Sequence, residues 1–339
     1  MEGHNLGVRG SIFVTAIRYN FTLNQAINWL LSHCAAVLLF TCLAAGQSLD
    51  DAHIQSQMGS IGKPLVVNVE LVLVPVSVND SMNRPVITLK KEDFTLYEQE
   101  KQKEIRYFSA EEAPISVAIL LDVSKSMSDK IDTERAAIVE FFNNANPEDE
   151  YFAIAFSDRP RLLAASTRSM EEVERKLIAV EPGGATAMLD AVYLAVSKLR
   201  STRYRRKAIV IFSDGGDNAS RYTMREVKGL VQESDVQIYA IGLFETFFFN
   251  TLEERLGRKW LSEITDPTGG RTITVDNRAK VPTAAATVSR ELRNEYILGY
   301  QPDNVHAKGW QKIKVAIAPT TTGKPLRAYY RKGYFAREN

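Results

Sequence analysis

Short apolar runs alternate with helix-forming stretches through the middle of this chain. Two of the runs, residues 117–121 and 208–212, have no polar side chain at all, which is typical of strands covered on both faces. The predicted strands are 117–121, 151–156, 161–165 (a short edge strand), 208–212, 236–242 and 272–275. The predicted helices are 136–144, 170–180, 186–199, a segment around 227–231, 252–264 and 279–293. Elements in this order predict an α/β fold, a doubly wound and mostly parallel sheet with helices on both faces.

The segments on either side of this alternation have the two-residue period of β-strands. The leading segment predicts strands from residue 66 to 78, at 94–97 and at 105–108, with a turn at 98–103. The trailing segment predicts strands at 296–300, 311–317 and 326–330. We expect the two flanks to pair into one small β-sandwich, with the α/β unit inserted between its strands. Two unrelated β ribbons are the alternative, and they would bury little apolar surface.

The apolar phase of the first predicted strand slips by one residue. Apolar side chains fall on odd positions up to Leu73 and on even positions from Val74. A strand cannot exchange its buried face without a distortion. The slip therefore predicts a bulge or bend near residues 71–74, or a strand that passes between two sheets.

The N-terminus has the composition of a secretory leader. Arg9 and Arg18 precede an apolar stretch at residues 35–45 that is short for a membrane span. Ala44-Ala45-Gly46 then offers the small residues that a signal peptidase requires. We interpret residues 1–46 as a cleaved signal peptide rather than a retained anchor.

Both cysteines of the chain, Cys34 and Cys42, lie inside this leader. The mature chain would then contain no thiol, no disulfide and no membrane span. Secretion without disulfides fits a secreted, periplasmic or cell-envelope protein of a bacterium. The expected division of the chain is a signal peptide at 1–46, a linker at 47–64, the first part of the sandwich at 65–112, the α/β domain at 113–294 and the second part of the sandwich at 295–339.

The bulk composition excludes one class of function. With 45% apolar and 24% charged residues, the chain has the composition of an ordinary soluble globular protein. A net charge of +1 argues against nucleic-acid binding driven by overall charge. The one basic run, residues 203–207, precedes an apolar strand and is interpreted as a solvated loop.

Oxygen-bearing side chains follow two of the buried strands and precede one helix. Asp122, Ser124 and Ser126 follow the strand at 117–121, and Asp214 follows the strand at 208–212. Thr186 opens a helix after Gly183-Gly184. Ligands of doubly wound sheets bind at the carboxyl ends of the strands, and ligand sets made of oxygen suit a hard cation such as Mg²⁺. The alternative is that Asp122 and Ser124 only cap the following helix.

These residues resemble the metal-ion-dependent adhesion site (MIDAS) of von Willebrand factor A domains. There, Asp-x-Ser-x-Ser is followed by a distant Thr and then by an Asp after a later strand, and all five positions are matched. Residues 91–94, 297–300 and 331–335 extend the resemblance over nearly the whole mature chain, to the von Willebrand factor A-related family abundant in Acidobacteria. Members of that family often carry a Gly in the hairpin turn after 94–97, where this chain has Glu98-Gln99-Glu100.

The resemblance implies a metal site of Asp122, Ser124, Ser126, Thr186 and Asp214. The implied ion is Mg²⁺, with Mn²⁺ or Ca²⁺ as alternatives, bound directly by the Ser and Thr oxygens and through water by the two Asp. Because only the two Asp carry charge, an open position on the ion would favour a carboxylate from another protein. The implied function is a secreted or envelope-associated adhesion module whose protein ligand supplies an Asp or Glu.

A Mg²⁺-dependent hydrolase or phosphotransferase is the competing function. The α/β unit has no Cys, and the four histidines all lie outside it, so the commonest general base and the thiol nucleophile are missing. The loop after 117–121 lacks the second Asp of an aspartyl-phosphate hydrolase, and no strand is followed by a Gly-x-Ser-x-Gly elbow or a phosphate-binding Gly-rich loop. We therefore expect no enzyme. A scaffold subunit with a vestigial metal site stays open.

Two further features near the expected site have two interpretations each. Phe247-Phe248-Phe249 follows the strand at 236–242 and either anchors a protein ligand beside the ion or packs under the helix that begins near residue 252. The second interpretation is favoured. Asp217 and Asn218 either shape the rim of the site or serve only as turn residues.

Overall fold

The computed structural model describes residues 71–110, 112–244, 252–303, 309–319 and 325–336. The predicted signal peptide, the predicted linker and Phe247-Phe248-Phe249 lie outside these ranges. Within the described residues, no helix is long and apolar enough to cross a membrane.

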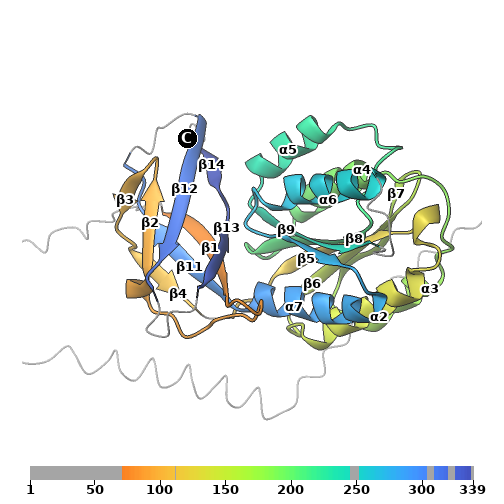
Figure 1. The fold of residues 1–339 in the computed structure, drawn as a ribbon, viewed down its shortest axis with the longest axis horizontal. Helices are drawn as coiled ribbons and strands as arrows, with labels where there is room; N and C mark the ends of the chain where they lie inside the picture. The colour runs from red at the N-terminus through yellow and green to blue at the C-terminus, as the bar shows by residue number, and fades with distance from the viewer. Residues whose placement is uncertain (1–70, 111, 245–251, 304–308, 320–324, 337–339) are drawn as a thin grey trace, which may run out of the picture. The chain divides into compact units, whose positions relative to one another are not determined.

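The centre of the molecule is a six-stranded sheet covered by helices on both faces (Figure 1). Its strand order is β10 (Thr272–Val275), β9 (Val236–Leu243), β8 (Lys207–Ser213), β5 (Ser116–Asp122), β6 (Glu150–Phe156) and β7 (Pro160–Thr167). Neighbouring strands are parallel except for β7, which is antiparallel to β6. Every residue of β5 is buried, as its uninterrupted apolar sequence predicts.

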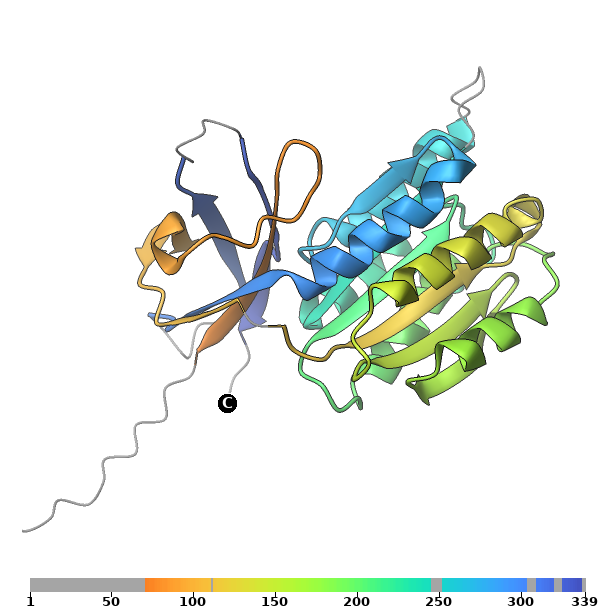
Figure 2. The same ribbon diagram turned by 90° about the horizontal axis from the view of Figure 1, so that it is seen from below.

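Two separate hydrophobic cores lie on the two faces of this sheet. One face is covered by α2 (Ile131–Asn143), α3 (Met170–Ile178) and α7 (Val281–Arg293), and the other by α4 (Met188–Leu199), α5 (Met224–Glu233) and α6 (Leu252–Thr265). Figure 2 shows α7 beside α2 on the first face. Alternate residues of β5 serve the two cores: Val117, Ile119 and Leu121 pack in the first, Ala118 and Leu120 in the second. Short 3-10 helices are η1 (Lys91–Asp93), η2 (Lys125–Met127) and η3 (Arg278–Lys280).

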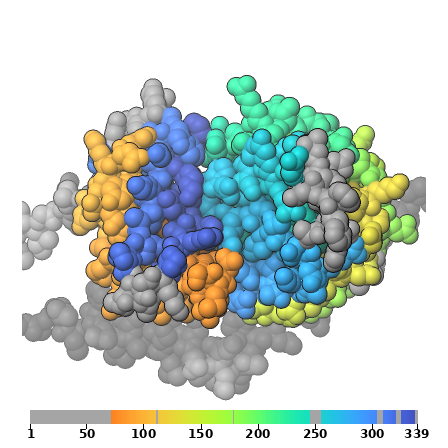
Figure 3. Space-filling model, in the orientation of Figure 1, coloured from red at the N-terminus to blue at the C-terminus, as the bar shows by residue number. Residues whose placement is uncertain are grey.

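The flanking segments pair with each other in two four-stranded sheets. One has the order β13 (Arg327–Tyr330), β1 (Val72–Asn79), β11 (Glu295–Tyr300) and β4 (Tyr107–Ser109). The other has the order β14 (Gly333–Ala336), β12 (Gly309–Ile317), β2 (Phe94–Glu98) and β3 (Lys101–Lys103). Each sheet contains strands from before and after the α/β unit, and the two parts of the sequence form one continuous surface, orange beside dark blue in Figure 3.

The inner faces of these sheets share one apolar core. Val74, Val76 and Val78 of β1 pack there with Leu96 and Tyr296, all of them at most 1% exposed. The predicted fold class, a doubly wound sheet flanked by a β-sandwich, is therefore confirmed. The residue-by-residue division into domains stays a prediction.

The first hairpin differs from the predicted one. Gln99 and Glu100 both have positive φ, 48° and 64°, and make a two-residue turn between β2 and β3. The expected turn at 98–103 was too long because neither residue is one of the glycines or asparagines that usually mark such a turn. The expected partner strand at 105–108 is instead β4, which pairs with β11 in the opposite sheet. The strand β14 was not predicted.

β1 does not contain the predicted bulge. Its register with β11 is regular from Val72 to Ser77, and the positions before Leu71 lie outside the described residues. Leu73 is apolar and yet 40% exposed because it lies across Gly299 on the outer face of the sheet. A Cβ on Gly299 would lie 3.1 Å from Leu73 Cδ2 and 2.7 Å from Tyr107 Cβ, so the glycine makes room for both side chains.

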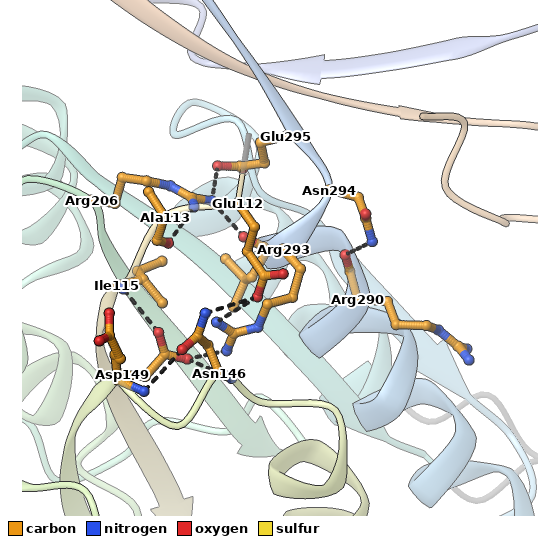
Figure 4. A network of polar contacts seen from close by, with 12 residues as sticks. Glu112, Ala113, Ile115, Asn146, Asp149, Arg206, Arg290, Arg293, Asn294 and Glu295 are labelled. Atoms are coloured by element: carbon orange, nitrogen blue, oxygen red, sulfur yellow. Dashed lines mark hydrogen bonds and ion pairs between the residues drawn. The ribbon is translucent and has the colours of Figure 1, made fainter. Parts of the chain in front are cut away.

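One arginine joins the two points at which the chain passes between the sandwich and the α/β unit (Figure 4). The Arg206 guanidinium donates to Ala113 O at 2.8 Å where the chain enters, and to Leu292 O and Glu295 Oε2 where it leaves. Beside it, Arg293 pairs with the fully buried carboxylate of Asp149. The interpretation of residues 203–207 as a solvated loop was wrong for Arg206, which bonds to backbone that comes together only in the fold.

A second buried network connects β1 of the sandwich to α7. Glu291 is 0% exposed, and its carboxylate accepts a hydrogen bond from Asn79 Nδ2 at 2.7 Å and from Arg271 Nε at 3.1 Å. The hydroxyls of Ser77 and Tyr239 are 3.3 Å apart nearby. A buried carboxylate is stable only with such partners, so this network specifies how the sandwich packs on the α/β unit.

Glu291→Ala is therefore expected to lower the free energy of unfolding by about 3 kcal/mol or more, because it leaves Asn79 and Arg271 without their common acceptor. Chemical denaturation followed by circular dichroism measures the effect. Arg290→Ala, on the exposed face of the same helix, is the matched control and should leave stability nearly unchanged. Equal stability of the two variants would contradict the role assigned to Glu291.

Candidate metal centre

The carboxyl ends of β5 and β8 lie side by side at one edge of the sheet. β5 ends at Asp122 and β8 ends at Ser213, since Leu121 pairs with Phe212 in parallel register. Ser213 Oγ donates a hydrogen bond to Asp122 Oδ2 at 2.5 Å, and the Ser124 amide donates to Asp122 Oδ1 at 3.0 Å. These bonds fix Asp122 at the edge with 0% of its surface exposed.

Ser124 and Ser126 begin the loop that follows β5. Their Oγ atoms are 3.2 Å apart, with Ser124 buried and Ser126 exposed. The amide of Lys125 between them donates to Gly184 O at 3.1 Å. The loop of the two serines is therefore hydrogen-bonded directly to the loop that carries Thr186.

Thr186 is buried in the loop before α4, and its backbone is fully paired. Its amide donates to Asn218 Oδ1 at 2.8 Å, and its carbonyl accepts from the amides of Asn218 at 2.9 Å and Ala219 at 3.1 Å. The amide of Ala185 donates to Asp158 Oδ1 at 2.8 Å. The loops after β8 and β6 thus fix Thr186 from two sides.

Asp214, the fifth predicted residue, follows β8 directly. Its Oδ2 is 3.5 Å from Lys130 Nζ, at the start of α2. Its negative charge is one of the causes that raise the pKa of Asp122, so the two carboxyl groups are close enough to repel each other. The structure brings all five sequence-predicted residues to one edge of the sheet.

The loop of Asp214 packs on α6 through two glycines. Gly215 has φ +82°, and a Cβ on it would lie 2.5 Å from Gly257 O. A Cβ on Gly257 would lie 2.4 Å from Asp214 O. Backbone therefore contacts backbone here, and neither position has room for a side chain.

The electrostatic environment of Asp122 opposes its charge. Burial, and then the neighbouring Asp214, raise the pKa of Asp122 from 3.8 to about 7. The hydrogen bonds from Ser124 and Ser213 act in the opposite direction but do not offset the burial. A cation at this edge would favour the ionised carboxylate and remove the repulsion.

A third acidic side chain, Glu134, lies behind Asp122. It is 0% exposed on α2, and among the described residues neither carboxyl oxygen has a hydrogen-bond partner. Burial and the charge of Asp122 raise its pKa well above the ordinary value. Glu134 was not predicted from the sequence, although the apolar spacing of Ile131, Ile138 and Phe141 places residue 134 on the buried face of the helix.

Three further residues that position the loops were not predicted from the sequence or had two interpretations. Asp158 was missed, although it follows strand β6 at the edge of the sheet where β5 ends with Asp122. Asp217 Oδ2 accepts from the Leu189 amide at 2.8 Å at the start of α4, and Asn218 binds Thr186 as described above. Both residues therefore fix the Thr186 loop, which is more than turn chemistry.

The donor chemistry of this edge fits a hard divalent cation. Two carboxylates and three hydroxyls supply only oxygen, the ligand type that Mg²⁺ and Ca²⁺ prefer. No cluster of three or more His, Cys, Asp or Glu that could hold a metal occurs in the described part of the chain, so a site here depends on the hydroxyl oxygens.

Comparison with known proteins identifies the α/β unit. Residues 117–216 match the family model of the von Willebrand factor type A domain. The α/β unit is a von Willebrand factor A domain. Such domains are commonly protein-interaction or adhesion modules rather than enzymes.

Two curated relatives of this chain are distant and only partly covered. Inter-alpha-trypsin inhibitor heavy chain H4 of Homo sapiens is 26% identical over 146 residues, which is 38% of this chain and 16% of the relative. An uncharacterized protein of Borreliella burgdorferi is 23% identical over 214 residues, 57% of this chain and 63% of the relative. The matched region is less than two thirds of either relative.

Several solved structures also resemble this chain at low sequence identity. A von Willebrand factor type A protein from Catenulispora acidiphila has a TM-score of 0.46 at 11% identity, covering 80% of this chain and 74% of that one. Proximal thread matrix protein 1 of the mussel byssus, solved with a zinc-occupied MIDAS motif, has a TM-score of 0.46 at 18% identity, covering 58% and 50%. The type V pili tip protein Mfa5 of Porphyromonas gingivalis has a TM-score of 0.42 at 12% identity, covering 53% and 95%.

The raised pKa of Asp122 gives the metal-free protein a defined pH dependence. Between pH 3.8 and about 7 the folded state holds a proton on Asp122 that the unfolded state has lost, so this residue's contribution to stability falls as pH rises. Asp122→Asn removes the titration and keeps the shape. In EDTA, the free energy of unfolding of Asp122→Asn minus that of the unsubstituted chain is expected to increase as the pH rises through this window. Below and above the window the difference should be constant. Denaturant titrations at a series of pH values measure this, and a constant difference would contradict the assignment.

The contact between Gly257 and the Asp214 loop gives a second expectation. Gly257→Ala should lower the free energy of unfolding by about 1–3 kcal/mol, because the new Cβ overlaps Asp214 O. Gly229→Ala in α5 is the matched control, since no atom lies within 4 Å of its added Cβ. There the better helix propensity of alanine should raise stability by up to about 1 kcal/mol. If chemical denaturation showed a change of the same sign in the free energy of unfolding for both variants, the close contact at Gly257 would be contradicted.

Proposed function

We propose that this von Willebrand factor A domain binds a divalent cation and that the ion holds a carboxylate of a protein partner. The ligands would be Asp122, Ser124, Ser126, Thr186 and Asp214, with Mg²⁺ as the ion and Mn²⁺ or Ca²⁺ as alternatives. The observation that carries the proposal is the burial of Asp122 beside Asp214 at the sheet edge. A buried carboxyl group whose pKa is raised by burial and by a neighbouring acid marks a candidate functional site.

The charge of the ligand set supports a carboxylate-bearing partner. Three of the five ligands are neutral hydroxyls, so the charge of the ligand set comes from two carboxylates alone and does not exceed that of a divalent ion. A coordination position left open on the ion would therefore attract a further anion. Ser126 is exposed while Asp122, Ser124 and Thr186 are buried, so the set opens to solvent on the side of Ser126. An Asp or Glu side chain of another protein has the right charge and reach for such a position.

An adhesion-type role also agrees with the leader predicted for residues 1–46. We infer secretion or attachment to the cell envelope from that sequence, and membership of the acidobacterial branch of the family from the resemblance of residues 91–94, 297–300 and 331–335. Cleavage of the leader, the linker at 47–64 and the bacterial compartment are parts of this proposal.

The enzymatic alternative has weaker support. The von Willebrand factor A domain has no His and no Cys in its sequence, so the nucleophilic groups beside Asp122 and Asp214, which are hydroxyls and the amine of Lys130, have no imidazole as a general base. A scaffold with a vestigial metal site would bind no divalent cation, so a measurement of metal binding distinguishes it from the proposal.

Mg²⁺ is expected to stabilise the chain by mass action, by about 2.7 kcal/mol at a concentration one hundred times its dissociation constant. Asp122→Ala should abolish this stabilisation and the calorimetric binding signal, while circular dichroism shows the metal-free variant folded. Asp132→Ala is the matched control, since this Asp is 89% exposed on α2 and is not a proposed ligand. Unchanged affinity in Asp122→Ala would defeat the metal assignment, and no binding by the unsubstituted chain would favour the scaffold.

A further inference from the structure

A buried lysine lies at the proposed metal site. Lys130, the residue before α2, is 8% exposed, and its Nζ is 3.5 Å from Asp214 Oδ2. Its amide donates to Met127 O at 2.9 Å, and its carbonyl accepts from the Glu134 amide at 3.0 Å. The backbone of Lys130 is thus fixed between the serine loop and the helix that carries Glu134.

The burial of this side chain calls for a reason. Lysine is rarely buried unless an anion pairs with it, because removing an ammonium group from water is costly. Asp214 is the anion that pairs with it among the described residues, and the side chain of Asp214 is itself 17% exposed. At 3.5 Å the two groups attract each other, but the separation is longer than that of a well-formed charged hydrogen bond.

We propose that the ammonium group of Lys130 is an internal counter-cation that neutralises Asp214 in the metal-free protein and withdraws when a divalent cation binds. This inference rests on the proposed metal-binding function and deepens it. Two positive charges cannot share Asp214 at close range without strong repulsion in a partly buried site. Metal binding is then an exchange of one cation for another, and Lys130 lowers the affinity of the site for the ion.

The exchange has a physical consequence for the edge of the sheet. The lysine stem has four flexible carbons, so the ammonium group can leave Asp214 without movement of the fixed backbone. Its withdrawal would carry positive charge away from Asp214 toward solvent, on the side of the domain where the proposed partner binds. By thermodynamic linkage, a partner that holds Lys130 away from Asp214 would raise the affinity for the metal, and the metal would raise the affinity for that partner by the same factor.

Lys130→Met tests the proposal because methionine keeps the length and apolar stem of the side chain and removes the charge. Isothermal titration with MgCl₂ should show at least about 10-fold tighter binding than in the unsubstituted chain, as expected from removing a close like charge. Lys125→Met is the matched control. It removes an exposed lysine from the same loop, between Ser124 and Ser126, and should change affinity by less than about 2-fold because solvent screens it.

A second measurement uses the unsubstituted chain and does not depend on how a variant folds. Acylation of lysine amines, located by mass spectrometry, should modify Lys130 slowly in EDTA and faster with saturating MgCl₂. Unchanged or weaker Mg²⁺ binding by Lys130→Met, or equal acylation of Lys130 in both conditions, overturns the proposal. If Mg²⁺ binds and Asp122→Ala abolishes it, such a result defeats the counter-cation alone. If neither the unsubstituted chain nor Lys130→Met binds Mg²⁺, the metal function fails and the counter-cation fails with it.

Discussion

The parallel pairing of β5 with β6 and β8 is the constraint on which the remaining architecture of this molecule depends. It makes the carboxyl ends of the central strands meet at one edge, where Asp122 ends β5 and Asp158 and Asp214 follow β6 and β8. β5 is buried along its whole length, and its only polar residues, Ser116 and Asp122, are at its two ends. Residues far apart in sequence are gathered by backbone register before any side chain takes part.

Side chains then turn this edge into a defined cluster. Asp158, Asp217 and Asn218 are not proposed ligands, yet each binds backbone amides in or near the Thr186 loop. Ser213 likewise donates to Asp122 rather than facing solvent. The five proposed ligands therefore stand on loops whose positions are fixed from outside the cluster, which is what preorganised binding requires.

Much of this arrangement could be predicted from the sequence, for a physical reason. A strand covered on both faces needs an uninterrupted apolar run, and the runs that become β5 and β8 are unambiguous. Their ends, and therefore Asp122 and Asp214, could be placed at the sheet edge without a structure. The MIDAS-like spacing added Ser124, Ser126 and Thr186 by resemblance.

The features that were missed or wrongly predicted depend on contacts between residues distant in sequence. Glu134 and Lys130 look like ordinary charged residues near a helix start, and only the fold shows that both side chains are buried near the site. Arg206 looks like part of a solvated basic loop until Ala113 and Leu292 are brought to it. The tight turn at Gln99 and Glu100 uses residues with no turn signature, and the exposed Leu73 depends on a glycine more than 200 residues away, Gly299.

Arg206 also has a consequence for how the sandwich can assemble. The sandwich strands before and after the inserted domain are separated by the whole length of that domain, and closing so long a loop is entropically unfavourable. Once the insert has folded, Ala113 and Leu292 accept hydrogen bonds from one guanidinium, and the two halves of the sandwich begin from nearly the same point. The folded domain thereby holds the ends of the two sandwich segments close together, so that strands distant in sequence start close together in space. During synthesis from the N-terminus, the backbone hydrogen bonds that β1 to β4 make with the later strands would stay unformed until the inserted domain has folded.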